Sequence, residues 1–123
     1  MKPMRFEDMI VYQLVQRFVV IGTDQDNALR TSAIAKFNRL FGEKKAIERE
    51  LKSRDGDQRR ALLDLYDHPN AQVRLNAVKA TLALAPEAGR RMLEAIADSR
   101  EYPQAGDASM TISALDQGIF KLT

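Results

Sequence analysis

The residues best suited to chemistry in this 123-residue chain are a single histidine and the acids near it. A catalytic histidine needs a nucleophile or a carboxylate within hydrogen-bond reach. His68 has Asp64 and Asp67 close by in sequence, but neither points at a nucleophile. His68 also directly precedes Pro69, a position that favours extended backbone. We therefore interpret His68 as a turn residue rather than as a general base.

The other groups that could do chemistry are equally poor candidates. The carboxylate pairs Glu48/Glu50 and Asp55/Asp57 occur at a charged helix end and at a helix cap. The chain has no cysteine, which excludes thiolate chemistry, disulfides and cysteine-held zinc, and one histidine is poor material for a metal site. The glycine pattern of a phosphate-binding loop is absent. We predict a protein without catalytic activity, cofactor or metal.

Composition is that of an ordinary soluble domain, with 45% hydrophobic and 29% charged residues. The length predicts a single domain over residues 1–123. No stretch approaches the roughly 20 apolar residues that cross a bilayer, so we expect a cytoplasmic protein that does not contact membranes. Aromatic residues make up only 7% and tryptophan is absent, which disfavours a base-stacking surface for single-stranded nucleic acid.

Positive charge is concentrated in the first half of the chain. Residues 30–60 hold ten basic and five acidic residues, although the whole chain has a net charge of only +2. A basic segment can attract an acidic partner or a phosphate backbone. It can equally be a solvated helix with internal pairs such as Lys44–Glu48. Both interpretations stay open.

Helical periodicity runs through almost the whole chain. We predict helices over residues 5–22, 27–53, 58–66, 71–84, 86–98 and 108–117. Glycine is a poor helix residue, so Gly22 predicts a break and Gly42 a kink or break. Asn70 and Asp107 are expected to cap helices, and Pro86 suits a first helical position.

Three of these segments share a pattern that predicts helical repeats. The segments "DNALRTSA", "NAQVRLNA" and "DASMTISA" begin at Asp26, Asn70 and Asp107. Each has a cap residue, an apolar residue three positions later and an alanine four positions after that. Their starts are 44 and 37 residues apart, and periods of this length are typical of a helical solenoid.

The arginine at position 74 interrupts the apolar side of its helix. Gln72, Asn76, Lys79 and Ala83 form one stripe that we expect to face water. Arg74 lies about 200° around the helix from Gln72 and points inward. An inward arginine must be paired or must extend its charged end to water.

The stretch "DHPNAQVRLNAVKATLAL", from Asp67 to Leu84, resembles the second helix of a HEAT repeat. The resemblance implies that Arg74 links neighbouring repeats by bonding an acidic side chain or a turn carbonyl, with Asp67, Asp107 or a loop carbonyl as its partner. It also implies structural roles for Asp67, Pro69, Asn70 and Asp107. In the third segment Thr111 replaces the arginine, as expected of a terminal repeat.

The whole chain is also similar to a family of small bacterial HEAT-like domains of unknown function. The segments "AKFNRLF", "HPNAQVRLNA" and "YPQAGDA" carry this likeness. It implies an all-α α–α superhelix of the HEAT/armadillo type, with about six helices in three antiparallel pairs. It brings no established activity.

The most interesting polar group on the surface is "KFNR". Lys36 and Arg39 share a helix face. Asn38 is expected either to point to solvent or to bond across the helix pair. In HEAT-like arrays the second helices line the binding surface, so we predict a partner-binding patch at Arg30, Lys36, Asn38 and Arg39.

The function that these patterns favour is protein–protein interaction, as an adaptor or as an inhibitor of the immunity type. The alternative is a nucleic-acid-binding HEAT-like domain that uses residues 30–60. A third hypothesis, a subunit similar to HEAT-containing lyases, has no supporting constellation of residues. Homodimerisation stays open, because three repeats are close to the minimum for stability and Ile119, Phe120 and Leu122 could dock on a second copy.

Overall fold

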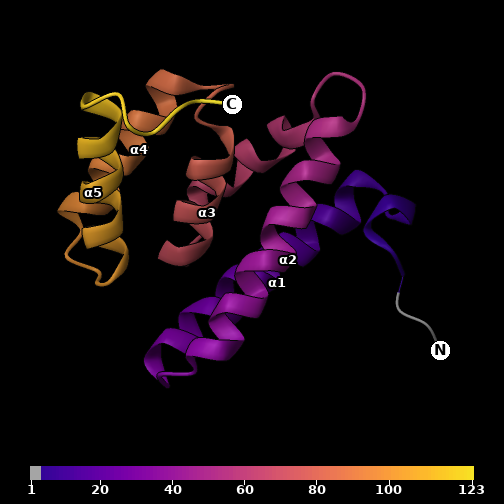
Figure 1. Cartoon of the computed structure of the whole chain (residues 1–123), viewed down its shortest axis with the longest axis horizontal. Helices are drawn as coiled ribbons and strands as arrows, with labels where there is room; N and C mark the ends of the chain where they lie inside the picture. Colours follow the sequence, from indigo (N-terminus) through magenta and orange to yellow (C-terminus); the bar gives the residue numbers. More distant parts are fainter. Residues whose placement is uncertain (1–3) are drawn as a thin grey trace. The chain divides into compact units, whose positions relative to one another are not determined.

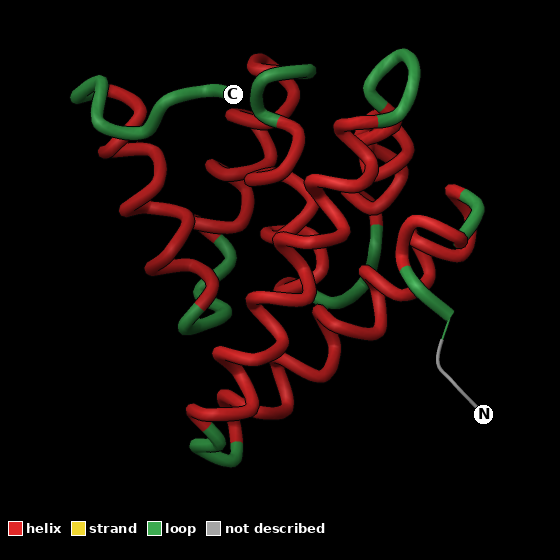
Figure 2. The backbone as a smooth tube through the Cα atoms, turned by 45° about the vertical axis from the view of Figure 1, so that its right-hand side comes forward, coloured by secondary structure: helices red, strands yellow, loops and turns green. Residues whose placement is uncertain are grey.

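The computed structural model describes residues 4–123, which form helices joined by turns with no strand in that range (Figure 2). Short 3-10 helices are labelled η. The elements in chain order are η1 (Phe6–Asp8), α1 (Val11–Arg30), α2 (Ile34–Ser53), η2 (Gln58–Asp67), α3 (Ala71–Thr81), α4 (Pro86–Asp98) and α5 (Gln104–Asp116). The six longer helices pack in antiparallel pairs, most clearly α1 with α2 and α4 with α5 (Figure 1). The all-α prediction is therefore confirmed.

The chain divides into two compact units, Met1–Ala61 and Leu62–Thr123. The first contains η1, α1 and α2, and the second contains α3, α4 and α5, while η2 crosses the boundary. No helix in residues 4–123 combines the length and the apolar character that a membrane span requires.

Helix α1 is continuous where the sequence predicts a break. Gly22 lies inside it, and the predicted cap Asp26 is an interior residue. The buried positions Leu14, Phe18, Ile21, Gln25 and Ala28 follow steps of four and three residues, so one side of the helix is buried along its whole length. Burial of that side outweighs the cost of about 1 kcal/mol for a helical glycine. The first of the three predicted repeats is therefore wrong in its boundaries.

The real turn between the first two helices lies at residues 31–33, where the sequence has neither glycine nor proline. Ser32 takes the left-handed conformation with φ 57°, and the amide of Ala33 donates to the carbonyl of Ala28 at 2.8 Å. Helix α2 then runs without a break through Gly42. The predicted break is therefore absent, and nothing lies within 4 Å of the position that a Gly42 side chain would take, so this glycine meets no packing demand.

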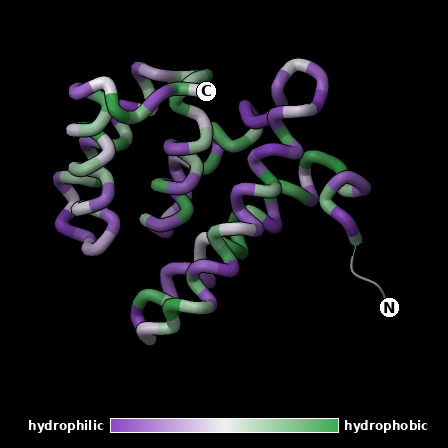
Figure 3. Tube along the Cα trace, viewed as in Figure 1, coloured by the Kyte–Doolittle hydropathy of each residue, from purple (hydrophilic) through white to green (hydrophobic). Residues whose placement is uncertain are grey.

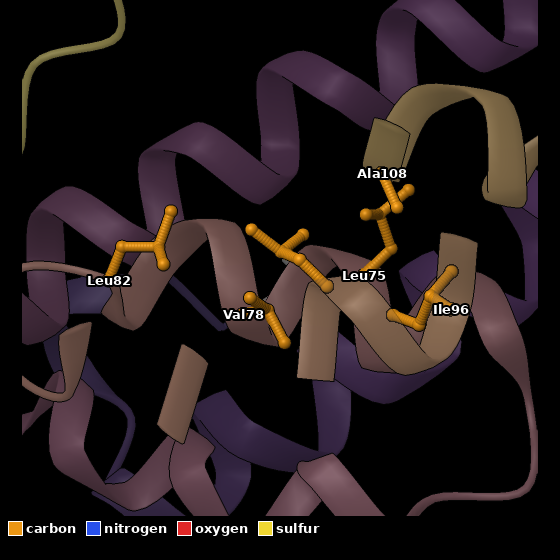
Figure 4. Close-up of a cluster of buried hydrophobic side chains, with 6 residues drawn as sticks. Leu75, Val78, Leu82, Ile96 and Ala108 are labelled. Carbon is orange, nitrogen blue, oxygen red and sulfur yellow. The ribbon is translucent and has the colours of Figure 1, made fainter. Parts of the chain in front are cut away.

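A cap residue and a proline predict helix starts in the second unit better than glycine predicts helix ends in the first. The side chain of Asn70 accepts hydrogen bonds from the amides of Gln72 and Val73, which confirms Asn70 as the cap of α3. Pro86 occupies a first-turn position of α4, as expected. The hydrophobic core of this unit brings residues of α3, α4 and α5 together (Figure 4): Leu75, Val78, Leu82, Leu93, Ile96 and Ala108.

The C-terminal segment is partly anchored to this core. Phe120 packs against the cluster, whereas Ile119 is 70% exposed and Leu122 is 43% exposed. The helical spacing of Met92 and Met110 predicts that both pack in the core. Met92 does so, but Met110 is 74% exposed. Ala108 and Thr111 mark the inner face of α5, and Met110 lies between them on the other side.

Candidate functional site

The four residues predicted to bind a partner lie around the turn between α1 and α2, and all four are exposed. Arg30 ends α1 and pairs with Asp26 at 3.2 Å. Lys36, Asn38 and Arg39 lie in the first turns of α2. The exposure of Asn38 selects the first of its two predicted alternatives, a side chain directed to solvent.

These residues do not form one face. At 100° per residue, Lys36 and Arg39 are about 60° apart around α2, but Asn38 is about 160° from Lys36. Asn38 shares its side of the helix with Gly42, Lys45 and Arg49, which are also exposed. The structure therefore divides the predicted patch between two sides of α2.

The turn before α3 is held by a small hydrogen-bond network. Arg74 Nη1 donates to the carbonyl of His68 at 2.8 Å and to that of Pro69 at 3.1 Å. His68 Nδ1 accepts from the amide of Asn70 at 3.0 Å. Arg74 thus bonds loop carbonyls, one of its predicted alternatives, and approaches Glu101 at 4.0 Å. Asp67, a predicted partner of Arg74, is an exposed residue at the end of η2.

Asp107 is not the cap of its helix, because α5 begins three residues earlier at Gln104. Its carboxylate instead lies in the first turn, where it accepts from Lys79 Nζ at 3.1 Å and from Thr111 Oγ1 at 3.2 Å. An acid in a first turn is stabilised by the helix dipole. Asp107 therefore links α5 to α3 through Lys79.

Two residues of the polar stripe predicted to face water, Gln72 and Asn76, are instead buried, whereas Lys79 is half-buried and Ala83 is exposed. Gln72 is 7% exposed and Asn76 is 4% exposed. Gln72 Nε2 donates to Asn76 Oδ1 at 2.9 Å, and Gln72 Oε1 accepts from Gln104 Nε2 at 3.0 Å. Buried amides are tolerated when their donors and acceptors are paired, so this chain of amides joins α3 to the start of α5.

An apolar pocket of about 670 Å³ lies beside α5 in the second unit. Its main apolar contributors are Tyr102, Met110 and Phe120, and the pair Lys79–Asp107 also lines it. Tyr102 is 72% exposed and Met110 is 74% exposed. The pocket thus combines large apolar side chains open to solvent with one ion pair.

Two further properties bear on chemistry: whether side chains could hold a metal ion, and which titratable groups have a shifted pKa. Within residues 4–123, His, Asp and Glu side chains form no group of three that could hold a metal ion. The carboxylates whose pKa is shifted lie in ion pairs: hydrogen bonds from the buried Arg59 lower the pKa of Asp57, and those from Arg90 lower the pKa of Asp116. Burial also raises the pKa of Tyr66.

Comparison with known proteins places the chain in a family. A family model described as a domain of unknown function, DUF2019, matches residues 12–116. The chain belongs to the DUF2019 family. The match covers α1 to α5 almost completely, so the family's domain includes most of both compact units of this DUF2019 protein. No curated protein matches the chain.

This DUF2019 protein is also similar to a protein of known crystal structure, RPA1889 from Rhodopseudomonas palustris CGA009. The two are 50% identical with a TM-score of 0.94, over 98% of this chain and 100% of the other. The expected likeness to an uncharacterised bacterial family is thereby confirmed.

Sequence reasoning missed the pocket residues of this DUF2019 protein for an identifiable reason. The helical spacing of Met110 predicts a core position, and Tyr102 lies in an irregular stretch. The available signal was the pattern Ala108, Thr111, Ile112 and Leu115, which sets the inner face of α5 and leaves Met110 outside it.

Proposed function

We propose that this DUF2019 protein is a non-catalytic module that binds another protein, as an adaptor or an inhibitor. The observation that carries the proposal is the exposed apolar surface of the second unit. Tyr102 and Met110 line the pocket and are each more than 70% exposed. Large exposed apolar side chains that gather around a pocket are typical of interaction sites.

The ion pair in the pocket gives this surface a means of selection. Lys79 and Asp107 are one-third to one-half exposed and contact each other at 3.1 Å. A partner that covers them must supply matching polar groups, because burying an unpaired charge is costly. The pocket thus suits a partner with an apolar side chain flanked by polar groups.

A HEAT-like arrangement of the helices is part of this proposal. It is supported by Arg74, which bonds the turn carbonyls before α3, and by the Asn70 cap. In repeat proteins of this type, binding surfaces are built from successive helices.

The test is affinity capture from the native lysate with the intact protein, Met110→Glu and the matched control Ser109→Glu. Ser109 is exposed on α5 but does not line the pocket. We expect a protein partner that survives moderate salt with the wild type and the control and is lost with Met110→Glu. Equal capture by all three would show that the pocket is not the binding site.

Nucleic-acid binding is the second candidate, and the exposed cations of α2 favour it. Lys36, Arg39 and Arg49 are exposed and form no ion pair with a carboxylate of residues 4–123. Binding of this kind weakens steeply with salt, because each neutralised phosphate releases counterions. Nucleic acid recovered only at low salt, without a protein partner, would favour this candidate.

A further inference from the structure

The side of α2 that carries Asn38 forms a continuous exposed stripe. Its positions follow steps of four and three residues, which keep them on one side of a helix. All five are exposed: Asn38, Gly42, Lys45, Arg49 and Lys52. At 1.5 Å per residue the stripe is about 21 Å long. Hydrophilic residues follow much of the α2 trace (Figure 3).

The stripe is positively charged because the acids of α2 are engaged elsewhere. Helix α2 has six basic and three acidic residues, a net charge of +3. Glu43 pairs with Arg17 of α1, Glu48 with Lys44, and Glu50 with Arg54, each at 2.8 Å. The weaker approach of Lys45 to Glu48, at 3.8 Å, leaves Lys45 48% exposed. Lys45 and Arg49 therefore present net positive charge to solvent.

Gly42 lies in the middle of this stripe, and no packing contact requires a glycine there. It is exposed, and the place of its missing side chain is open space. A glycine in the interior of a helix costs about 1 kcal/mol relative to alanine. A small residue at the centre of a helix face allows another backbone to approach closely. The space over Gly42 therefore suits a crossing helix.

An apolar contact lies at the edge of the stripe. Phe41 is 45% exposed, and Lys45 Nζ lies 5.6 Å from the centre of its ring. A partner that rests on the stripe can place one apolar side chain on Phe41. The stripe thus combines cations, a gap and an exposed ring.

We propose that this stripe of α2 binds an acidic amphipathic helix of another protein. The partner helix would cross α2 at Gly42, with carboxylates every three or four residues facing Lys45 and Arg49. This inference rests on the proposed function, because both require a protein partner. The surface on α2 is separate from the apolar pocket.

Charge argues against the other occupants. A second copy of the chain that presented the same stripe would bring cations against cations. Residues 62–123 carry six basic and eight acidic residues, so the excess of positive charge is confined to the first unit. The positively charged stripe is only a few helical turns long. Its length is closer to that of a peptide segment than to that of a long polyanion.

The test measures binding of a labelled helical peptide of about 20 residues, with glutamates at steps of three and four, to the full chain at about 50 mM salt. A single-stranded DNA of equal charge is the comparison. We expect the peptide to bind more tightly, with amide NMR shifts concentrated in residues 38–52.

Charge-reversal variants distinguish peptide binding at the stripe from non-specific attraction to the net positive charge of the protein. The double change Lys45→Glu and Arg49→Glu is expected to weaken peptide binding about tenfold or more. Its control is Arg91→Glu with Lys121→Glu, which changes net charge equally at exposed sites in the second unit and is expected to change binding about twofold or less.

Substitution at Gly42 tests the close approach. Gly42→Leu should also weaken binding about tenfold, whereas Gln16→Leu on the exposed side of α1 should not. The inference is overturned if the peptide does not bind, or if the double variant and its control lose peptide affinity equally. It is also overturned if the DNA binds more tightly than the peptide, or if the chain forms a dimer whose interface covers α2. Failure of the Met110 capture alone would leave it standing, because that variant tests the pocket.

Discussion

Arg74 Nη1 lies 2.8 Å from the carbonyl oxygen of His68, six residues earlier in the chain, and 3.1 Å from that of Pro69. The arginine therefore closes the turn that precedes its own helix. Its side chain is 18% exposed; its bond to the carbonyl of His68 is partly buried, whereas its bond to that of Pro69 is exposed. This arrangement explains a charged residue on the apolar side of α3 without any catalytic role.

Replacing Arg74 with alanine should lower the free energy of unfolding by about 1–3 kcal/mol, because it leaves the partly buried carbonyl of His68 without its donor. Arg74→Lys should recover part of the loss, since one ammonium cannot reproduce the guanidinium geometry. Urea unfolding measures both. The control is Arg91→Ala, at an exposed position of α4; an Arg74→Ala effect equal to that of the control would contradict the role.

Gly89 and Gly42 should respond to alanine in opposite directions. A Cβ at buried Gly89 would lie 2.7 Å from Leu82 Cδ2 and 3.4 Å from the Tyr66 hydroxyl, whereas Gly42 has open space. We expect Gly89→Ala to destabilise by about 1–3 kcal/mol through overpacking. Gly42→Ala should stabilise by about 0.5–1 kcal/mol. Thermal or urea unfolding would reject this packing argument if both changes had the same sign.

Local signals explain which parts of the fold are predictable from sequence. The Asn70 cap and Pro86 act within one turn of their helices, and both predictions hold. The continuity of α1 through Gly22 depends on burial along the whole helix, which no short window contains. The turn at Ser32 likewise has no glycine or proline to mark it.

Predictions about the surface fail where polar residues pair over long sequence distances. Gln72 appears exposed from its position on the helix wheel, but its partner Gln104 lies 32 residues away. Met110 shows the reverse error, because an apolar residue at helical spacing is outside the core. Residue type alone could not separate these two cases.

The buried amides should behave as a coupled pair. Gln72→Leu or Gln104→Leu alone leaves a buried amide group without its partner and should cost about 1–3 kcal/mol. The double variant should cost less than the sum of the two, because both members of the bond are removed together. A double-mutant cycle in urea measures this. Strictly additive effects would show that the 3.0 Å contact contributes nothing to stability.

Tyr66 should give the protein a specific alkaline dependence. Its hydroxyl contacts Thr81 Oγ1 at 2.6 Å, and burial raises the pKa of Tyr66 above its usual value of 10.0. Because the folded-state pKa is higher than the unfolded one, the stabilisation is complete below the unfolded pKa. It is lost as pH rises through the folded value.

The free energy of unfolding should therefore fall above about pH 10. Tyr66→Phe should remove the part of this decrease that comes from ionisation of Tyr66. At neutral pH the same change should cost about 1 kcal/mol, because the hydrogen bond to Thr81 is lost. Urea unfolding from neutral to alkaline pH measures the difference between the two proteins, which cancels the titration of lysines common to both. The control Tyr12→Phe changes a tyrosine that is 68% exposed and should leave the profile unaltered. Parallel profiles for the wild type and Tyr66→Phe would show that the buried hydroxyl does not resist ionisation in the folded protein.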